Sequence, residues 1–416
     1  MFNYNKISFQ LKDFIANFTN NMIITLPKPI SKALTALIYG IIKSNSCMLS
    51  NIARSLKETI KIKDSVDRLT KNLDKIFLFR AVIYNNYYNH IKPYITDETL
   101  FHVDDSDINK NKSKALENLD WVKDGSDEDG KLVKGYWVNE IVATNGNNVF
   151  SVYSKIYSTL TKGFKSANNE TYKGIAEVIK AFGKIGTYVM DRGYDSRAFL
   201  LYFLKKGIKF IIRGKKNRDV IYNDKKINIL ELANKFKGKF RITLIIKGKK
   251  LTRYASCVKV KLPNSKYRIY AVFVYFKGET VIFYTNQEIE CKKDIIRVVT
   301  SYYSRWKIEE YFKFKKQQFG FENFRVRSLS KMNGLNLILS LAIGCITLIN
   351  QNTASLKAAI IYHAGVIKEK VFFEYYRLGS GIREILSHTV VGIRNKVVFQ
   401  CNKYVQLSIF GNFAET

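Results

Sequence analysis

The chain has 416 residues, enough for two or three domains, and 46% of them are hydrophobic, which excludes a mainly disordered protein. Its 69 Lys and Arg residues against 35 acidic ones give a formal net charge of +34. This excess favours polyanionic partners over small acidic substrates. The codon bias of an AT-rich genome would also raise the number of lysines, and an anionic membrane surface is the competing partner.

The cysteines and histidines exclude several kinds of site. The five cysteines are scattered without a CxxC pair, and the four histidines are dispersed. This argues against a disulfide framework, a zinc site and a Ser-His-Asp triad, and it fits a reducing cytoplasm. A catalytic metal, if there is one, is therefore expected to be held by carboxylates.

No targeting or membrane-spanning segment is expected. The N-terminal residues lack the basic start and uninterrupted apolar core of a signal peptide. The longest apolar run, Leu337–Ile349, is shorter than the roughly 20 residues that a spanning helix needs. We predict that this run is a buried core helix.

Residues 1–94 are predicted to be helical. The segment 31–44 has apolar residues at helical spacing, and Ser46 could cap a second helix. A third periodic stretch contains Val66, Leu69 and Leu73. Three short helices in a basic setting predict a DNA-binding region of the helix-turn-helix kind, with a plain helical bundle as the alternative.

From residue 95 the pattern changes to strands. Three β-rich runs come first, then helices and strands alternate; these segments are 99–106, 135–144, 148–158, 172–183, 186–194 and 196–214. This order predicts an α/β fold, an RNase H-like mixed sheet flanked by helices, over residues 95–350. A β-rich insertion is expected at about 215–278, and a helical tail at 351–416.

One long helix, from about Lys292 to Phe319, carries an unusual polar stripe. At 100° per residue its polar side chains share one face within about 60°; they are Tyr302, Arg305, Glu309 and Lys316. A carboxylate beside two cations and a hydroxyl suits a phosphate track next to a metal ligand. An ordinary solvated face with i, i+4 ion pairs explains the stripe equally well.

Two earlier acidic motifs follow apolar strands. Asp104 lies at the end of the apolar run in FHVDDSD, while Asp105 should point to the opposite face of the strand. A shift of one residue in the strand register would exchange the faces to which Asp104 and Asp105 point. The alternative without a catalytic role is a solvated acidic turn. Asp191 ends the strand in TYVMDRGY, where Gly193 permits a tight exit turn and Asp195 is expected to cap the next helix.

Together these motifs resemble a known family. Tyr302, Arg305, Glu309 and Lys316 reproduce the Y-(2)-R-(3)-E-(6)-K signature of insertion-sequence transposases of the "insertion sequence four" family. The D-x-S pattern that begins at Asp104 and the D-R-G-Y pattern that begins at Asp191 are similar to the two other motifs of that family. The resemblance covers about residues 95–350 and is strongest at these motifs.

The resemblance implies a catalytic mechanism. Asp104, Asp191 and Glu309 would be the catalytic carboxylates and the metal ligands. They would hold two Mg²⁺ ions, with Mn²⁺ as a substitute, since Mg²⁺ prefers oxygen ligands and two ions can serve an in-line displacement at phosphorus. Asp104 would bridge both ions.

The resemblance also implies which groups contact DNA. Tyr302, Arg305 and Lys316 would hold the DNA near the cleaved phosphate. Basic residues beside the second motif and in the following strand are weaker candidate DNA contacts; they are Arg192, Arg213 and Arg218.

The resulting hypothesis is a cut-and-paste transposase in a bacterial cytoplasm, associated with the nucleoid. It would bind double-stranded transposon ends and target DNA as a homodimer in the end complex, with the tail as a possible dimer contact. A metal-dependent nuclease that cuts without joining is one alternative, and a non-catalytic DNA-binding protein descended from a transposase is another. A basic membrane-surface protein comes last.

Overall fold

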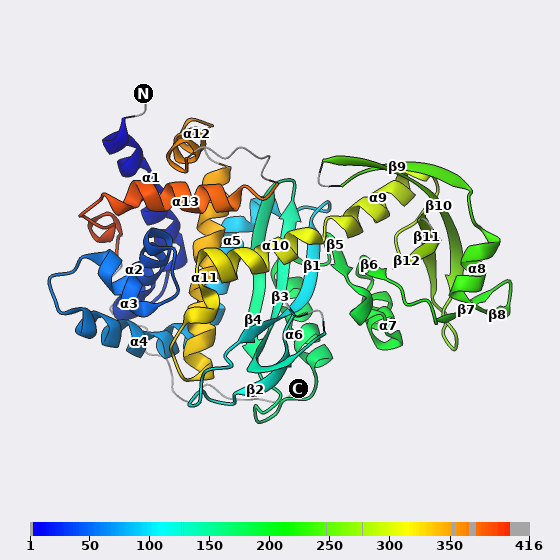
Figure 1. The fold of residues 1–416 in the computed structure, drawn as a ribbon, viewed down its shortest axis with the longest axis horizontal. Coiled ribbons are helices and arrows are strands. Elements are labelled where there is room, and N and C mark those ends of the chain that lie inside the picture. The colour runs from blue at the N-terminus through cyan, green and yellow to red at the C-terminus, as the bar shows by residue number, and fades with distance from the viewer. Residues whose placement is uncertain are drawn as a thin grey trace.

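The computed structural model has three parts that lie side by side in Figure 1: a group of helices from both ends of the chain, a central sheet, and a strand-rich part. The residues that the structure describes are 3–125, 127, 129–246, 248–276, 278–351, 354–365 and 372–399.

The central sheet has the RNase H-like strand order β4-β3-β1-β5-β6. β1 is antiparallel to β3 and β3 to β4, whereas β5 and β6 continue parallel to β1. Short β2 pairs with the start of β3. The predicted α/β fold class is therefore confirmed. The strands are β1 Leu100–Asn109, β2 Asp120–Lys123, β3 Leu132–Asn145, β4 Asn148–Tyr157, β5 Thr187–Met190 and β6 Phe210–Arg213.

Helices cover both faces of this sheet. Neighbouring residues in a strand face opposite sides, and on β3 Asn139 contacts Thr171 of α6 (Ala167–Phe182). The next residue, Glu140, contacts Lys315, which also binds Asn336 of α11 (Leu329–Asn350). Helices α6 and α11 therefore lie on opposite faces. The shorter α7 (Arg197–Lys206) follows β5 and begins at Ser196, whose side chain caps it.

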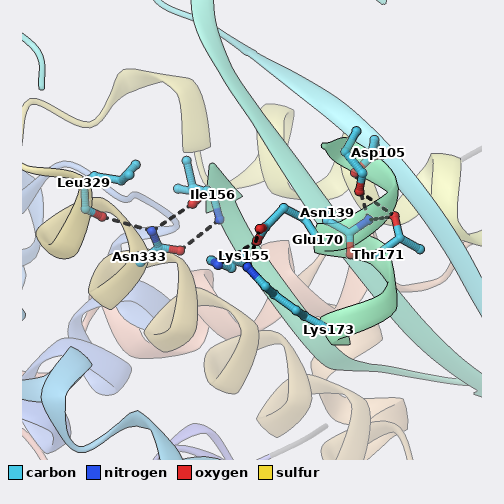
Figure 2. Close-up of polar contacts among 10 residues, drawn as sticks. Asp105, Asn139, Lys155, Ile156, Glu170, Thr171, Lys173, Leu329 and Asn333 are labelled. Carbon is cyan, nitrogen blue, oxygen red and sulfur yellow. Dashed lines mark hydrogen bonds and ion pairs between the residues drawn. The ribbon is translucent and has the colours of Figure 1, made fainter. Parts of the chain in front are cut away.

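Helix α11 is the predicted buried core helix. It is long and apolar enough to cross a membrane, with a mean hydropathy of 1.9, yet all of that window is buried within the protein. Its side chains also provide hydrogen-bond partners for the backbone at the edge of β4. Asn333 accepts from the backbone N–H of Ile156 at 2.8 Å and donates to the carbonyl of Ile156 at 3.0 Å (Figure 2). The amide thus pairs with β4 as a neighbouring strand would.

Helices from the two ends of the chain pack together around α11 (Figure 1). Helices α2, α4 and α13 all contact α11, and α1 contacts both α12 and α13. Residues 1–94 are helical, as predicted. The helix that Ser46 was expected to cap is Leu49–Leu56 (α3), and Met48 rather than Ser46 stands at its N-cap position. The helices are α1 Tyr4–Met22, α2 Lys28–Ser44, α3 Leu49–Leu56, α4 Ile62–Leu78, α5 Arg80–Ile91, α12 Ala354–His363 and α13 Tyr375–Ser387.

The β-rich insertion is present and extends the central sheet. Its last strand, β12, pairs antiparallel with β6, so the insertion continues the sheet outward through β11 and β10. A separate apolar core forms between these strands and the helix that follows them. The elements are β7 Asp219–Tyr222, β8 Lys225–Asn228, α8 Ile229–Lys235, β9 Phe240–Ile246, β10 Lys249–Lys261, β11 Arg268–Phe276 and β12 Glu279–Thr285.

The prediction of one long helix after the insertion is wrong. The structure has α9 (Lys292–Tyr303), then α10 (Trp306–Lys313), then a π-helical turn, η3 (Phe314–Gln318). The apolar side of α9 packs into the core of the insertion, whereas Ile308 and Tyr311 of α10 pack into the main core. The apolar sides of α9 and α10 therefore fill two separate cores, and the break lies between them.

The expected division at residues 94 and 350 stays a prediction. The predicted dimer contact in the tail lies partly outside the described residues, since 352–353, 366–371 and 400–416 are not among them. Within the described part, α13 contacts α1, α2 and α11 of the same chain.

Candidate active site

The two candidate aspartates of β1 face opposite sides of the sheet. Asp104 points toward α10, where its Oδ2 accepts a hydrogen bond from Arg305 Nη1 at 2.7 Å. Asp105 points toward α6 and accepts a hydrogen bond from Asn139. Asp104 is thus the one that shares a face with the helix carrying Glu309.

Asp191 lies level with Asp104 on the neighbouring strand. The parallel pairing of β1 and β5 ends at Val103 opposite Met190, so the next residue of each strand is one of the two aspartates. The Asp191 side chain accepts from the backbone N–H of Gly193 at 2.7 Å, which holds the tight exit turn η2 (Arg192–Tyr194). Two carboxylates therefore meet where these strands stop pairing.

Glu309 joins this group through Arg305. Arg305 Nη2 donates to Glu309 Oε1 at 2.5 Å, while Nη1 of the same guanidinium bonds Asp104. Burial lowers the pKa of Arg305, but Asp104, Glu309, Tyr302 and Asp191 together raise it above its ordinary value. The break between α9 and α10 places Arg305 where it reaches both Asp104 and Glu309, and α10 lies over β1.

The electrostatics of Asp104 favour a cation at the site. Burial raises the pKa of this carboxyl to about 7; Arg305 opposes the shift, and Asp191 and Asp105 add to it. Because the pKa of Asp104 in the folded protein lies above its ordinary value of 3.8, folding takes up a proton at this group. The folded protein therefore loses stability as the pH rises from 3.8 toward 7. A bound divalent ion would offset that cost.

Removing this charge should stabilise the metal-free protein. We expect Asp104→Asn to melt at a higher temperature than wild type at pH 8 in the presence of a chelator, and the difference to shrink at pH 5, where wild-type Asp104 is largely protonated. Thermal melting at the two pH values measures this. A lower melting temperature at pH 8 would show that the bond to Arg305 outweighs the cost of burying the charge.

The donor set fits a divalent metal. Among the described residues, no three Asp, Glu, His or Cys side chains already converge on one point at metal-binding distance. Instead, the guanidinium of Arg305 stands between Asp104 and Glu309 and neutralises them. Carboxylate oxygens gathered around one cation are the ligands that Mg²⁺ prefers.

The other residues of the helix signature are separated by the break. Tyr302 is the last residue but one of α9 and is buried in the second core, its ring centroid 4.6 Å from that of Phe283. Lys316 lies in the π-helical turn and binds Asp107 at 3.1 Å and Glu322 at 3.2 Å. The predicted single stripe is therefore wrong as a helix face, although Arg305 and Lys316 both still reach β1.

The weaker DNA-contact candidates differ in exposure. Arg192 is exposed in the exit turn, and Arg213 is partly exposed at the end of β6. Arg218 instead forms an ion pair with the fully buried Asp195, whose other oxygen accepts from the backbone N–H of Lys215. The expected capping role of Asp195 is thus wrong, and this pairing makes a DNA contact by Arg218 less favourable.

The buried ion pair that lies behind the site was not predicted from the sequence. Glu140, directly opposite Asp104 in the β1–β3 register, pairs with Lys315 at 2.9 Å, and both side chains are at most 1% exposed. Ser154 and Asn336 complete the network. The signal available was a glutamate inside the apolar run YWVNEIVAT, which needs a buried partner.

The fold and the acidic group are typical of the predicted class, transposases with three carboxylates. Residues 93–345 match the family model described as "Transposase DDE domain", which is more than half of the chain. The chain belongs to this transposase family, whose DDE domains generally use divalent metal ions. The narrower assignment to the "insertion sequence four" family stays a prediction.

The remaining comparisons are distant. A similar solved structure is described as a cryo-EM structure of the piggyBac transposase synaptic complex with hairpin DNA. It shares 10% sequence identity at a TM-score of 0.46, over 95% of this chain and 85% of that chain. No curated protein matches this chain.

Proposed function

We propose that this transposase binds transposon ends, cleaves the DNA there and joins it to target DNA, using two Mg²⁺ or Mn²⁺ ions. The observation that carries the proposal is that Arg305 binds both Asp104 and Glu309, while Asp191 lies level with Asp104 at the end of the β1–β5 pairing. The three carboxylates come from three segments of the chain, and Glu309 follows each of the two aspartates by more than a hundred residues. Asp104, Asp191 and Glu309 would hold the ions.

Each side chain has a separate task in this proposal. When bound, two divalent ions can activate the attacking oxygen and stabilise the leaving one. Arg305 would turn from the carboxylates to a DNA phosphate, because its planar donors suit phosphate oxygens. Lys316 and the exposed Arg192 would add positive charge along the DNA, and Tyr302 would position Arg305 by packing at the end of α9.

A strand-transfer assay tests the proposal. A labelled duplex carrying the element's own end is incubated with the protein, Mg²⁺ and a supercoiled target plasmid. Cleaved ends joined to the plasmid are expected. Cleavage without joining would identify a nuclease, and binding without cleavage would identify a DNA-binding descendant.

A basic groove between the N-terminal helices and the central part suits the DNA backbone. It is lined by α3, α4 and the segment before α11, and contains Arg325, Arg327 and Lys331 together with Ser50 and Thr70. Arg325 and Arg327 are exposed, whereas Lys331 forms an ion pair with Asp74 of α4 at 3.2 Å. We propose that it holds phosphates of the transposon end, beside helices α3 and α4 of the predicted DNA-binding region.

Removing these charges should weaken end binding and its salt dependence. The double variant Arg325→Ala/Arg327→Ala is expected to lose about tenfold in affinity, and the slope of log affinity against log salt should fall by about 2, since each phosphate contact contributes about 0.9. Binding is measured by fluorescence anisotropy at several salt concentrations. Lys205→Ala/Lys206→Ala, on α7, removes the same charge from two exposed residues. An equal loss in both variants would show that the groove makes no particular contact.

A further inference from the structure

The carboxylate beside Asp104 is held by a separate hydrogen-bond network on the α6 face of the sheet. Asp105 Oδ1 accepts from Asn139 Nδ2 at 2.8 Å, and Oδ2 accepts from the hydroxyl of Tyr194 at 3.4 Å. Asn139 Nδ2 also contacts Thr171 Oγ1 at 3.1 Å, as Figure 2 shows. Asn139 and Thr171 are fully buried, and Tyr194 is nearly so.

Asp105 is bound directly by residues of two elements and is linked to a third through Asn139. Asn139 belongs to β3, Thr171 to α6, and Tyr194 to the exit turn after β5. Thr171 is held in turn by its own helix, because its hydroxyl donates to the carbonyl of Ala167 at 3.3 Å. A side chain that is bound by two elements, one of them anchored on a third, is fixed in position, and so is the backbone that carries it.

The network begins where the backbone pairing of β1 and β5 ends. The last paired residues are Val103 and Met190, so Asp104 and Asp191 lie beyond the hydrogen-bonded register. Tyr194 is three residues after Asp191 in the same turn, and its backbone N–H bonds the carbonyl of Asp191. The bond from Tyr194 to Asp105 therefore connects the two aspartate-bearing segments beyond the point where β1 and β5 stop pairing.

We infer that Asp105 is a positioning residue, which sets the spacing of Asp104 and Asp191 through its hydrogen bond from Tyr194 and its anchor on Asn139. This inference rests on the proposed function, because it concerns the same carboxylates. Groups that orient metal ligands typically change metal affinity by 10–100-fold when removed. The network should therefore affect metal binding more than it affects folding or DNA binding.

Two tyrosine variants provide a matched test. Tyr194→Phe removes the hydroxyl that binds Asp105. Tyr188→Phe removes a hydroxyl on β5 that is buried without a hydrogen-bond partner among the described residues. Mn²⁺ binding to the full chain is measured by calorimetry, alongside thermal melting and affinity for end DNA. Tyr194→Phe is expected to weaken Mn²⁺ binding about tenfold with DNA affinity unchanged, and Tyr188→Phe to bind Mn²⁺ as wild type does.

Two further variants keep the test decisive if Tyr194→Phe folds poorly. Asp105→Asn keeps an acceptor for Tyr194 and is expected to retain measurable cleavage, whereas Asp104→Asn should abolish it. Equal Mn²⁺ affinity in Tyr194→Phe and Tyr188→Phe, or loss of cleavage in Asp105→Asn as complete as in Asp104→Asn, would overturn the inference. If Asp104→Asn itself binds Mn²⁺ and cleaves as wild type does, the proposed function fails instead.

Discussion

Asp104→Asn, Asp191→Asn and Glu309→Gln should each bind transposon-end DNA but lose about a thousandfold or more in cleavage rate. Each substitution removes the charge of one of the three proposed metal ligands. Metal ions supply several kcal/mol of charge stabilisation in such displacements, and about 4 kcal/mol corresponds to roughly a thousandfold. Cleavage of a labelled end duplex in Mg²⁺ measures the rate, and gel shift measures binding.

A neighbouring glutamate provides the control. Glu310 is next to Glu309 on α10, but it pairs with Lys313 at 3.5 Å. Glu310→Gln makes the same chemical change and should cleave at close to the wild-type rate. If Glu309→Gln cleaved as well as Glu310→Gln, Glu309 would not be the third ligand. Wild-type cleavage by all three carboxylate variants would place the active site elsewhere.

Lys315→Met should cause the largest loss of stability among the changes considered. It would leave Glu140 without its charged partner in a site that is fully buried. Breaking a buried ion pair from one side typically costs about 3–5 kcal/mol in the free energy of unfolding. The loss should also disturb η3 and α10, because Lys315 ties this turn to β3 and α11. Urea denaturation followed by circular dichroism measures the change.

The double variant Glu140→Gln/Lys315→Met separates charge from packing. It leaves no buried charge, and the glutamine oxygen can still accept from Ser154, so we expect it to recover about half of the lost stability or more. Lys316→Met changes the next lysine, which pairs with Asp107 but is itself 25% exposed, and should cost less than Lys315→Met because its ammonium group keeps some contact with water. If the double variant were less stable than Lys315→Met alone, the cost would arise from packing rather than from the unpaired charge.

Local sequence patterns were sufficient to predict the RNase H-like order and the buried helix. Alternating and periodic apolar residues determine which segments become strands and helices, and the predicted strand order followed from the order of those segments. The positions of Asp104 and Asp191 at the end of strand pairing could also be predicted, because each follows an apolar run that pairs as a strand.

The partners within the site could not be predicted in the same way. Arg305 binds Asp104 from 201 positions away, and Lys315 binds Glu140 from 175 positions away. No local period encodes such distances. Arg218 looked like a DNA contact in the sequence, but it lies beside Asp195 once β6 and the exit turn are placed together.

By itself, the sequence determined the class of protein, the three acidic motifs and the order of the elements, because all of these depend on residues that are close together in the chain. The tertiary structure decided that α9 and α10 are separate helices, since their apolar faces fill two separate cores. It also decided that Lys315 turns inward and Lys316 toward β1. A helical period assumes a straight, uniform helix, and the break and the π-helical turn change which side chains face the sheet.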